Sequence, residues 1–147
     1  MPAISTNPAA CNCLALRQAT RHVTQFYDQF LVPAGIRATQ YSILARLERR
    51  GAMTINALAA ELVMDRTTLG RNIRPLQRDG LVAIGPGKAD RRRKELRLTE
   101  SGKARFQIAQ KAWTKAQANF EQAFGRKRAR ALRVLLEDVA SRELAAV

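Results

Sequence analysis

The sequence predicts a mainly α-helical fold with one small β-hairpin, arranged as a single domain over residues 1–147. Apolar residues recur at steps of three and four along most of the chain, which is the spacing of an amphipathic helix. Only the stretch at 81–99 has the short apolar and alternating runs typical of strands. A chain of 147 residues can bury one hydrophobic core and leaves little room for a second domain.

The first helix is expected to begin at Asn7 and Pro8, because asparagine is a good N-cap and proline is tolerated at the first helical position. It ends at the segment VPAG, residues 32–35. Between these limits the apolar side chains form one stripe, made of Leu16, Ala19, Val23, Phe26 and Phe30. A second helix is predicted after it, with Thr39 as the N-cap and Gly51 as the end.

Residues 53–82 have the pattern of two short helices separated by a tight break at 63–65. Thr54 is placed to cap the first of them and Asp65 the second. Two short helices joined by a few residues are typical of a helix-turn-helix, whose second helix enters the major groove of DNA. We therefore expect the helix that follows Asp65 to be a recognition helix.

This recognition helix has two faces of opposite character. One face is apolar and should be buried, with Leu69, Ile73 and Leu76. The other face is polar and basic, with Thr67, Arg71, Arg74 and Arg78, and with Thr68 at its edge. Pro75 lies inside the helix, where proline removes one hydrogen bond. Because the apolar stripe continues through it, the sequence predicts one helix with a kink near residues 71–75.

The hairpin is predicted from strands at residues 81–84 and 94–99, joined by a loop at 85–93. A hairpin that follows a helix-turn-helix makes a winged helix, here over about residues 37–99, and its loop is the wing. Thr99 can cap a long helix with apolar positions at Phe106, Ala109, Trp113, Ala116 and Phe120. A final helix carries Leu132, Leu135, Leu136, Val139 and Leu144 on one side.

The terminal helices, at about residues 8–32 and 100–145, carry longer apolar seams than one small core requires. Long helices with continuous seams indicate a partner subunit. We therefore expect these segments to be dimerisation helices and the protein to be a homodimer.

Charge points to a polyanionic partner. Lys and Arg number 26 against 12 Asp and Glu, which gives a net charge of +14. Residues 66–105 carry 12 basic and 4 acidic residues, a net charge of +8. No apolar run approaches the ~20 residues of a membrane helix, and the opening residues lack the pattern of a secretory signal. We expect double-stranded DNA as the partner, no membrane association and a cytoplasmic location.

The wing lies next to the recognition helix, so its cations can reach phosphates or the narrow minor groove, and Asp90 can orient an arginine by a charge-assisted hydrogen bond. The predicted DNA-binding residues are Arg66, Thr67, Thr68, Arg71, Asn72, Arg74, Arg78, Lys88, Asp90, Arg91, Arg92 and Arg93. Hydrogen-bonding side chains among them favour a protein that reads bases. The alternative is an architectural protein indifferent to sequence, for which charge alone suffices.

Catalysis, a metal and a cofactor are not expected. The chain has no glycine loop that would cradle a phosphate, and its single histidine has no nucleophile or carboxylate partner nearby in sequence. Two cysteines and one histidine cannot complete a four-ligand zinc site.

Two segments resemble the MarR family of bacterial transcription regulators. They are DRTTLGRNIRPLQRDGLV at residues 65–82 and DRRRKELRLTESG at residues 90–102, the latter with Asp-x-Arg in the wing and Leu-Thr-x-x-Gly after it. The resemblance extends from about Cys11 to Leu144. It implies a homodimer that binds a pseudo-palindromic operator and represses nearby genes until a ligand or an oxidant releases it.

In that family the residue that matches Arg92 enters the minor groove, and the residue that matches Asp90 orients the wing. The chain departs from the family pattern at Gly70 and Pro75 in the recognition helix. Those departures affect which bases the helix contacts.

Two kinds of switch are compatible with the sequence. The first is a small aromatic ligand, which the resemblance places between the dimerisation helices and the winged helix, with Arg17, His22, Tyr27 and Tyr41 as the polar residues around it. The second is a thiol. The resemblance to the branch that senses organic hydroperoxides aligns Cys13 with the reactive cysteine and Tyr27 with one of its tyrosine partners, while Arg17 and Ala38 occupy the other two tyrosine positions.

A thiol near a helix N-terminus is acidified by the helix dipole, and Arg17 follows Cys13 by one turn. Cys11 and Cys13 are two residues apart, so on a helix they point about 160° away from each other. A disulfide between them requires the helix end to unwind, and the alternative is a bond to the partner subunit. As small apolar residues at a subunit boundary, both cysteines can also be purely structural.

Overall fold

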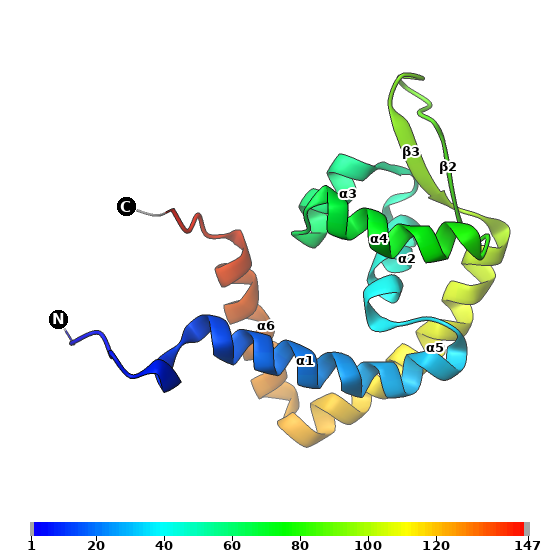
Figure 1. The fold of residues 1–147 in the computed structure, drawn as a ribbon. Coiled ribbons are helices and arrows are strands. Elements are labelled where there is room, and N and C mark those ends of the chain that lie inside the picture. The colour runs from blue at the N-terminus through cyan, green and yellow to red at the C-terminus, as the bar shows by residue number, and fades with distance from the viewer. Residues whose placement is uncertain (1, 146–147) are drawn as a thin grey trace.

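The computed structural model describes residues 2–145 and has a mainly helical fold with a small antiparallel sheet, as predicted (Figure 1). The helices are α1 (Asn12–Leu31), α2 (Ala38–Arg50), α3 (Ile55–Leu62), α4 (Arg66–Arg78), α5 (Glu100–Phe124) and α6 (Arg126–Ser141). The strands are β1 (Met53–Thr54), β2 (Val82–Pro86) and β3 (Lys94–Leu98). Two short 3₁₀ turns lie at Pro8–Ala10 and Val32–Ala34.

The elements form two groups in space. Helices α2, α3 and α4 gather with the sheet, while α1, α5 and α6 are the longer helices on the other side (Figure 1). Helix α5 joins the two groups, since it starts at the base of the β2–β3 hairpin and ends at the turn into α6. No helix within residues 2–145 has an apolar stretch that could cross a membrane.

The hydrophobic core lies mainly under α2, α3, α4 and the sheet. The largest fully buried side chains are Leu31, Ile43, Leu44, Leu58, Leu69, Leu76 and Leu96. The predicted buried stripe of α4 is confirmed, because Leu69, Ile73 and Leu76 are at most 3 % exposed. Burial of each such side chain contributes about 1.5–3 kcal/mol to the free energy of folding. The stripe therefore fixes the orientation of α4 and leaves its basic face exposed to solvent.

The start of α1 differs from the prediction. Asn7 does act as an N-cap, but its side chain accepts a hydrogen bond from the backbone N–H of Ala9 and caps only the 3₁₀ turn. The backbone of Cys11 is extended (φ −70°, ψ 113°), which interrupts the helix after that turn. The α-helix therefore begins at Asn12, with Cys11 as its N-cap, and it ends at Leu31 as predicted.

The predicted N-cap of α2 is also wrong. Thr39 lies inside the helix, which starts at Ala38. The backbone N–H of Ala38 instead donates to the carboxylate of Asp28 on α1, at 2.7 Å, and Gln40 accepts from the N–H of Arg37. A cap supplied from ten residues away has no local sequence signature. The predicted end is correct, since Gly51 closes the helix with a positive φ of 78°.

The helix-turn-helix is built by the caps that the sequence predicts. Thr54 accepts a hydrogen bond from the N–H of Ala57, and Asp65 accepts one from the N–H of Thr68 at 2.8 Å. Between the two helices Val63 adopts the left-handed conformation (φ 52°), which makes the tight break. Helix α4 runs through Pro75 as a single helix, as predicted.

The sheet has one strand more than predicted and a shorter loop. The strand order is β1–β3–β2, and Ile84 pairs with Leu96 in the antiparallel hairpin. Strand β1 was missed because two residues are too few to show an alternating pattern. Strand β2 extends to Pro86, which pairs with Lys94, so the wing loop is 87–93 rather than 85–93.

The segment Leu-Thr-x-x-Gly joins the wing to α5, and its threonine and glycine each have a distinct structural role. The hydroxyl of Thr99 caps α5 by accepting from the N–H of Gly102 at 3.0 Å, and it donates to the carbonyl oxygen of Gly80 at 2.5 Å. A Cβ atom on Gly102 would lie 1.9 Å from the carbonyl oxygen of Leu81. Glycine is therefore required for the first turn of α5 to pack against the base of the wing.

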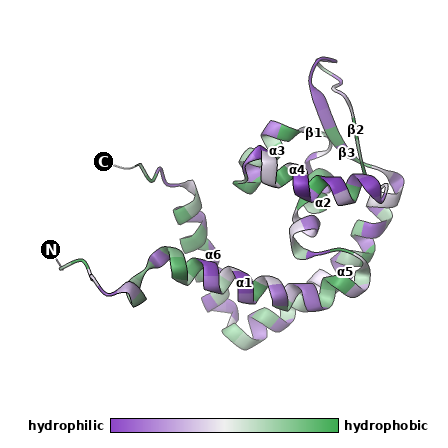
Figure 2. Ribbon diagram, viewed as in Figure 1, coloured by the Kyte–Doolittle hydropathy of each residue, from purple (hydrophilic) through white to green (hydrophobic). Residues whose placement is uncertain are grey.

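Helix α6 is the least buried of the long helices. Within the described residues its only buried side chain is Ala129, while Leu135, Leu136 and Val139 are 64 %, 40 % and 44 % exposed. Figure 2 shows hydrophobic stretches along α6 and the start of α1. Leu144 was predicted on this helix but lies beyond its end at Ser141. The apolar seam of α6 is thus mostly uncovered in the single chain.

Candidate nucleic-acid interface and an apolar cleft

Helix α4 presents a basic face to solvent. Its side chains Arg66, Thr67, Thr68, Arg71, Arg74 and Arg78 are all exposed, while Asn72 is half-buried. Leu69 and Ile73 hold the opposite face against the core. The buried stripe thus determines which side chains can meet another molecule, and those are the residues predicted from helical periodicity.

Two of the predicted base-reading residues are engaged within α4. The hydroxyl of Thr68 donates to the carboxylate of Asp65 at 2.8 Å. The side-chain amide of Asn72 donates to the backbone carbonyl of Thr68 at 3.1 Å. Thr67 and Arg71 make no such contact among residues 2–145, so their polar atoms are the ones available to a base edge.

Asp65 is ionised over a wider pH range than an ordinary aspartate. The backbone N–H of Thr68 and then its hydroxyl donate hydrogen bonds to the carboxylate, which lowers the pKa of Asp65 from its ordinary value. An ionised cap at the N-terminus of α4 also interacts favourably with the helix dipole. The start of the recognition helix is therefore fixed by a charged cap.

The wing loop is held in shape by its own backbone. The N–H of Gly87 donates to the carbonyl of Arg93 at 2.7 Å, and the N–H of Arg92 donates to the carboxylate of Asp90 at 3.0 Å. A Cβ on Gly87 would lie 2.7 Å from the carbonyl oxygen of Asp90, so the turn requires glycine there. The loop folds tightly around residues 87–93.

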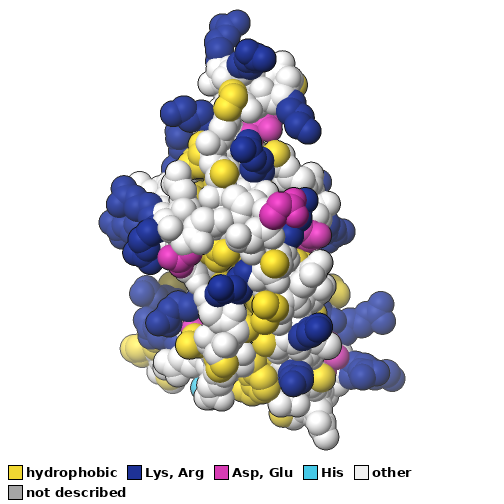
Figure 3. All heavy atoms as spheres, turned by 90° about the vertical axis from the view of Figure 1, so that its right-hand side faces the viewer, with side chains coloured by type: hydrophobic (Ala, Val, Ile, Leu, Met, Phe, Trp, Pro, Cys, Tyr) yellow, Lys and Arg dark blue, Asp and Glu magenta, His cyan; other side chains and the backbone are white. Residues whose placement is uncertain are grey.

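Asp90 also makes a long ion pair with one of the wing arginines, Arg92. The Nε atom of Arg92 lies 3.8 Å from the Asp90 carboxylate, and the Arg92 side chain is 96 % exposed. Lys88, Arg91 and Arg93 are exposed too and have no carboxylate within 4.0 Å among residues 2–145. Figure 3 shows basic side chains at the end of the molecule that carries the hairpin. The wing thus projects a net positive charge beside α4.

A second feature is an apolar cleft of 1220 Å³ between α1, α2, α5 and α6. Four of the six residues predicted for an effector or redox site line it, namely Cys13, Arg17, Tyr27 and Tyr41. Leu16, Trp113 and Leu136 contribute to its apolar walls. Because Tyr41 belongs to α2 and Tyr27 to α1, the cleft touches both the winged helix and the terminal helices.

The other two predicted residues are not in this cleft. His22 lines a separate hollow of 290 Å³ with Phe26, Phe120 and Phe124. His22 precedes Tyr27 by five residues, which places the two side chains about 140° apart around α1. Cys11 lies before the first turn of α1 and lines neither space.

The two cysteines are not both helical, contrary to the premise of the prediction. Cys13 is in the first turn of α1, whereas Cys11 is the extended N-cap, whose sulfur accepts from the N–H of Leu14 at 3.4 Å. Both thiols are exposed and unpaired. Within residues 2–145, His, Cys, Asp and Glu side chains form no group of three or more that could hold a metal ion.

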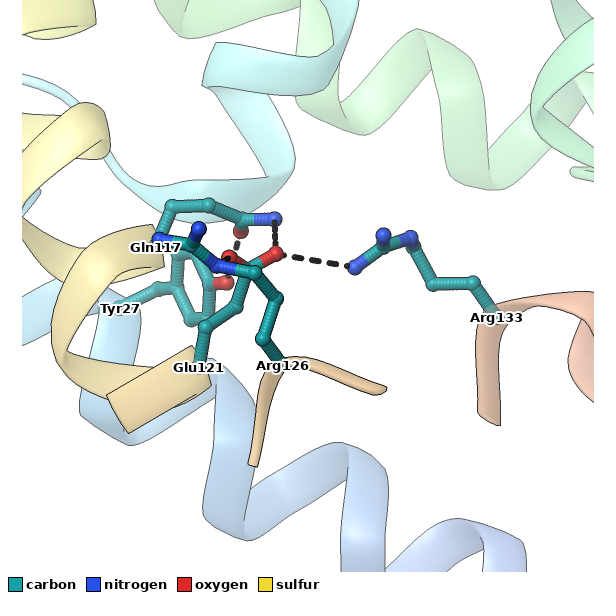
Figure 4. A network of polar contacts seen from close by, with 5 residues as sticks. All are labelled: Tyr27, Gln117, Glu121, Arg126 and Arg133. Atoms are coloured by element: carbon teal, nitrogen blue, oxygen red, sulfur yellow. Dashed lines mark hydrogen bonds and ion pairs between the residues drawn. The ribbon is translucent and has the colours of Figure 1, made fainter. Parts of the chain in front are cut away.

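One wall of the cleft contains a polar network that the sequence did not reveal (Figure 4). The hydroxyl of Tyr27 donates to the side-chain oxygen of Gln117, whose amide nitrogen donates to Glu121 at 3.4 Å. Glu121 pairs with Arg133 at 3.3 Å and with Arg126 at 3.7 Å. The network links α1, α5 and α6. Gln117 and Glu121 are one turn apart on α5, but only the packing of three helices identifies their partners.

The tyrosine in this network stays protonated at neutral pH. Burial raises the pKa of Tyr27 and the nearby carboxylate of Glu121 raises it further, although Arg133 lowers it. The hydroxyl is therefore a donor, in keeping with its bond to Gln117. Tyr41, on another wall, has its pKa raised by burial and stacks on Trp113 with ring centres 5.9 Å apart.

The comparisons with known proteins agree with this geometry. A model of the MarR family matches residues 34–93. The transcriptional regulator MosR from M. tuberculosis is 35 % identical, with 89 % of this chain and 96 % of MosR covered and a TM-score of 0.75. The structure of MosR in complex with DNA is 37 % identical, with 90 % of this chain and 99 % of that MosR chain covered and a TM-score of 0.74.

NadR in complex with 4-hydroxyphenylacetate is 26 % identical, with 97 % and 100 % of the two chains covered and a TM-score of 0.75. Among curated proteins, none matches the chain significantly. The family match lies on the winged helix, and the identity to MosR extends over nearly the whole chain. The chain belongs to the MarR family of DNA-binding transcriptional regulators.

Proposed function

We propose that the chain is a homodimeric, sequence-specific repressor that binds a pseudo-palindromic operator through α4 and the wing. The observation that carries the proposal is the exposed set of cations on these two adjacent elements, of which only Arg78 and Arg92 pair with a carboxylate within residues 2–145. Arg71 and Thr67 on α4 read base edges, and Arg92 on the wing enters the minor groove, where the negative potential attracts arginine. The relative MosR has a structure in complex with DNA.

Dimerisation follows from the uncovered apolar surface. Leu135, Leu136 and Val139 of α6 are 40–64 % exposed, and Leu14 and Leu16 of α1 are 44 % and 38 % exposed. Contiguous apolar side chains on neighbouring long helices are characteristic of an interface between subunits. A second copy packed on this surface places two recognition helices on one duplex, so that operator symmetry mirrors protein symmetry.

The cleft is the site of a small aromatic ligand that releases the repressor. Trp113 and Tyr41 offer aromatic surfaces, while Arg17 and Tyr27 offer polar groups to fix its orientation. The relative NadR has a structure in complex with 4-hydroxyphenylacetate. Because Tyr41 is on α2, a ligand in the cleft contacts the winged helix directly and can change its position relative to α1 and α5.

A titration with two readouts tests this function. Fluorescence anisotropy compares binding to the duplex upstream of the protein's own gene with binding to a random duplex at one salt concentration. We expect an affinity ratio well above tenfold, whereas an architectural protein gives a ratio near one.

With 4-hydroxyphenylacetate as the probe, we expect quenching of the single tryptophan, Trp113, together with loss of DNA binding. Quenching without release contradicts the ligand switch.

A thiol switch is the second candidate, and the position of Cys11 favours it. Only Asn12 separates the extended Cys11 from Cys13 in the first turn of α1, so unwinding of that turn is enough to bring the sulfurs together. An organic hydroperoxide oxidises Cys13 to a sulfenic acid and leaves as the alcohol; Cys11 then displaces water to form a disulfide. The two thiols are oxidised and the peroxide bond is reduced.

The two candidates are distinguished with reduced protein and protein treated with cumene hydroperoxide. The thiol switch predicts that the treated wild-type protein releases the upstream duplex and that Cys13→Ser stays bound. Equal binding by treated and reduced wild-type protein contradicts it and leaves the aromatic ligand as the only proposed switch.

A further inference from the structure

The first two turns of α6 carry a concentration of positive charge that the DNA interface does not use. Residues 126–133 include five basic residues and no acidic residue. Two of the five, Arg126 and Arg133, pair with Glu121. The other three are exposed and have no carboxylate within 4.0 Å among residues 2–145. These three, Lys127, Arg128 and Arg130, are named here the α6 patch.

The folding of α6 does not account for this charge. Positive side chains in the first turn of a helix interact unfavourably with the helix dipole, and here the first turn contains no acidic residue and no side-chain cap. Arg128 lies over the ring of Phe124, with its guanidinium carbon 4.2 Å from the ring centre. The side chains of Lys127 and Arg130 make no hydrogen bond or ion pair within residues 2–145.

Two residues of the α6 patch, Lys127 and Arg130, point away from the cleft. Ala129 is the buried residue of α6, and at about 100° per residue Lys127 points roughly 160° and Arg130 roughly 100° away from it. Leu136, which lines the cleft, is on the same side as Ala129. Leu136 and Val139 are about 120° or more from Lys127 and Arg130 around the helix, so dimerisation through these two apolar side chains leaves both cations accessible.

The position of the patch separates it from the winged helix. Helix α5 begins at the base of the wing and ends at the turn into α6, and its 25 residues span about 37 Å. In Figure 1 the α5–α6 turn and the tip of the β2–β3 hairpin lie at opposite ends of the molecule. A duplex that lies on α4 and the wing is therefore far from the α6 patch.

We propose that the α6 patch is a second phosphate-binding surface that holds a second DNA duplex while the winged helices hold the operator. This proposal rests on the proposed function. Arginine and lysine without acidic neighbours suit a phosphate backbone. A protein partner instead needs an apolar or aromatic anchor at the centre of the contact, and the nearest aromatic ring, Phe124, is covered by Arg128. One dimer then bridges two DNA segments.

A capture experiment tests the bridge. Beads carry the duplex upstream of the protein's own gene, the full-length protein is bound and washed, and a fluorescent random duplex of 25 base pairs is added. We expect capture by the wild-type protein. Lys127→Gln/Arg130→Gln should reduce capture at least fivefold and leave affinity for the bead-bound duplex within twofold. The matched control is Lys111→Gln/Lys115→Gln, which removes the same charge from an exposed face of α5 and should retain capture.

The outcomes separate this inference from the proposed function. No capture by the wild-type protein, or equal loss in the patch and control variants, contradicts the second surface and leaves operator binding intact. If the wild-type protein binds the upstream duplex no better than random DNA, the proposed function fails instead. The α6 patch is then tested by the affinity for the random duplex. Lys127→Gln/Arg130→Gln must weaken this affinity, and the control pair must leave it unchanged. Circular dichroism checks that each variant is folded.

Discussion

The carboxylate of Asp28 on α1 accepts a hydrogen bond from the backbone N–H of Ala38 at 2.7 Å and thereby caps α2. Its second oxygen lies 3.9 Å from the guanidinium of Arg37. A terminal helix thus supplies the cap of the first helix of the winged unit. This contact fixes the junction between α1 and α2.

Removal of this cap should destabilise the protein. Loss of a carboxylate cap costs about 1 kcal/mol, so Asp28→Ala should lower the free energy of unfolding by about that amount. Asp28→Asn keeps an acceptor oxygen and should lose less. Arg37→Gln is the control, because an exposed ion pair at 3.9 Å contributes little. Urea denaturation of the three variants measures the differences; a change in Arg37→Gln as large as in Asp28→Ala would assign the stability to the ion pair.

Gly102→Ala should be strongly destabilising, because the new Cβ would lie 1.9 Å from the carbonyl oxygen of Leu81. Relief of that overlap requires movement between α5 and the wing, and overpacking of this kind costs about 1–3 kcal/mol. Gly70→Ala is the matched control, since no neighbouring atom lies within 4 Å of its Cβ position. In the helix interior that change should stabilise by up to about 1 kcal/mol. Thermal unfolding of both variants measures the contrast, and a neutral Gly102→Ala would refute the packing account.

Arg92→Ala should weaken binding to every DNA site by roughly tenfold, or about 1.4 kcal/mol, with more loss where A·T-rich flanks narrow the minor groove. The side chain is 96 % exposed and makes only the long pair with Asp90, so the change should not alter stability. Anisotropy titrations on two duplexes with different flanks measure the effect. Lys111→Ala serves as the charge control. Unchanged affinity in Arg92→Ala would remove the wing from the DNA interface.

Acid should weaken the N-terminus of α4 through Asp65. Hydrogen bonds from Thr68 lower the pKa of Asp65, so the ionised cap stabilises the folded state above the ordinary aspartate pKa. This stabilisation is lost as the pH falls through the depressed pKa of the folded state. Asp65→Asn keeps a cap that does not titrate. Melting temperatures from pH 6 down to pH 2.5 should show the advantage of the wild-type protein disappear with acid, and a constant difference would contradict the assignment.

The features that the sequence predicts correctly depend on residues that are close together along the chain. Thr54, Asp65 and Thr99 each cap a helix by accepting a hydrogen bond from the N–H group three residues later. The residue types and their spacing were therefore enough to locate these caps. The buried stripe of α4 and the exposed wing followed from periodicity and from the charge pattern. These features supplied the winged helix and most of the candidate DNA-binding surface.

What the sequence missed depends on tertiary packing. The α2 cap comes from Asp28 on another helix, and Gln117 gains its role only where α5 lies against Tyr27. His22 and Tyr27 are both expected around the small aromatic ligand, yet they line different spaces.

The central claim is that α4 and the wing bind DNA by neutralising phosphates and reading sequence. The most direct measurement is the affinity for the duplex upstream of the protein's own gene at several salt concentrations, beside a random duplex. If the dimer neutralises roughly 6 to 10 phosphates, the slope of log K against log salt is about −5 to −9, and the upstream duplex binds well over tenfold more tightly. A slope near −2, or equal affinity for both duplexes, would contradict the account.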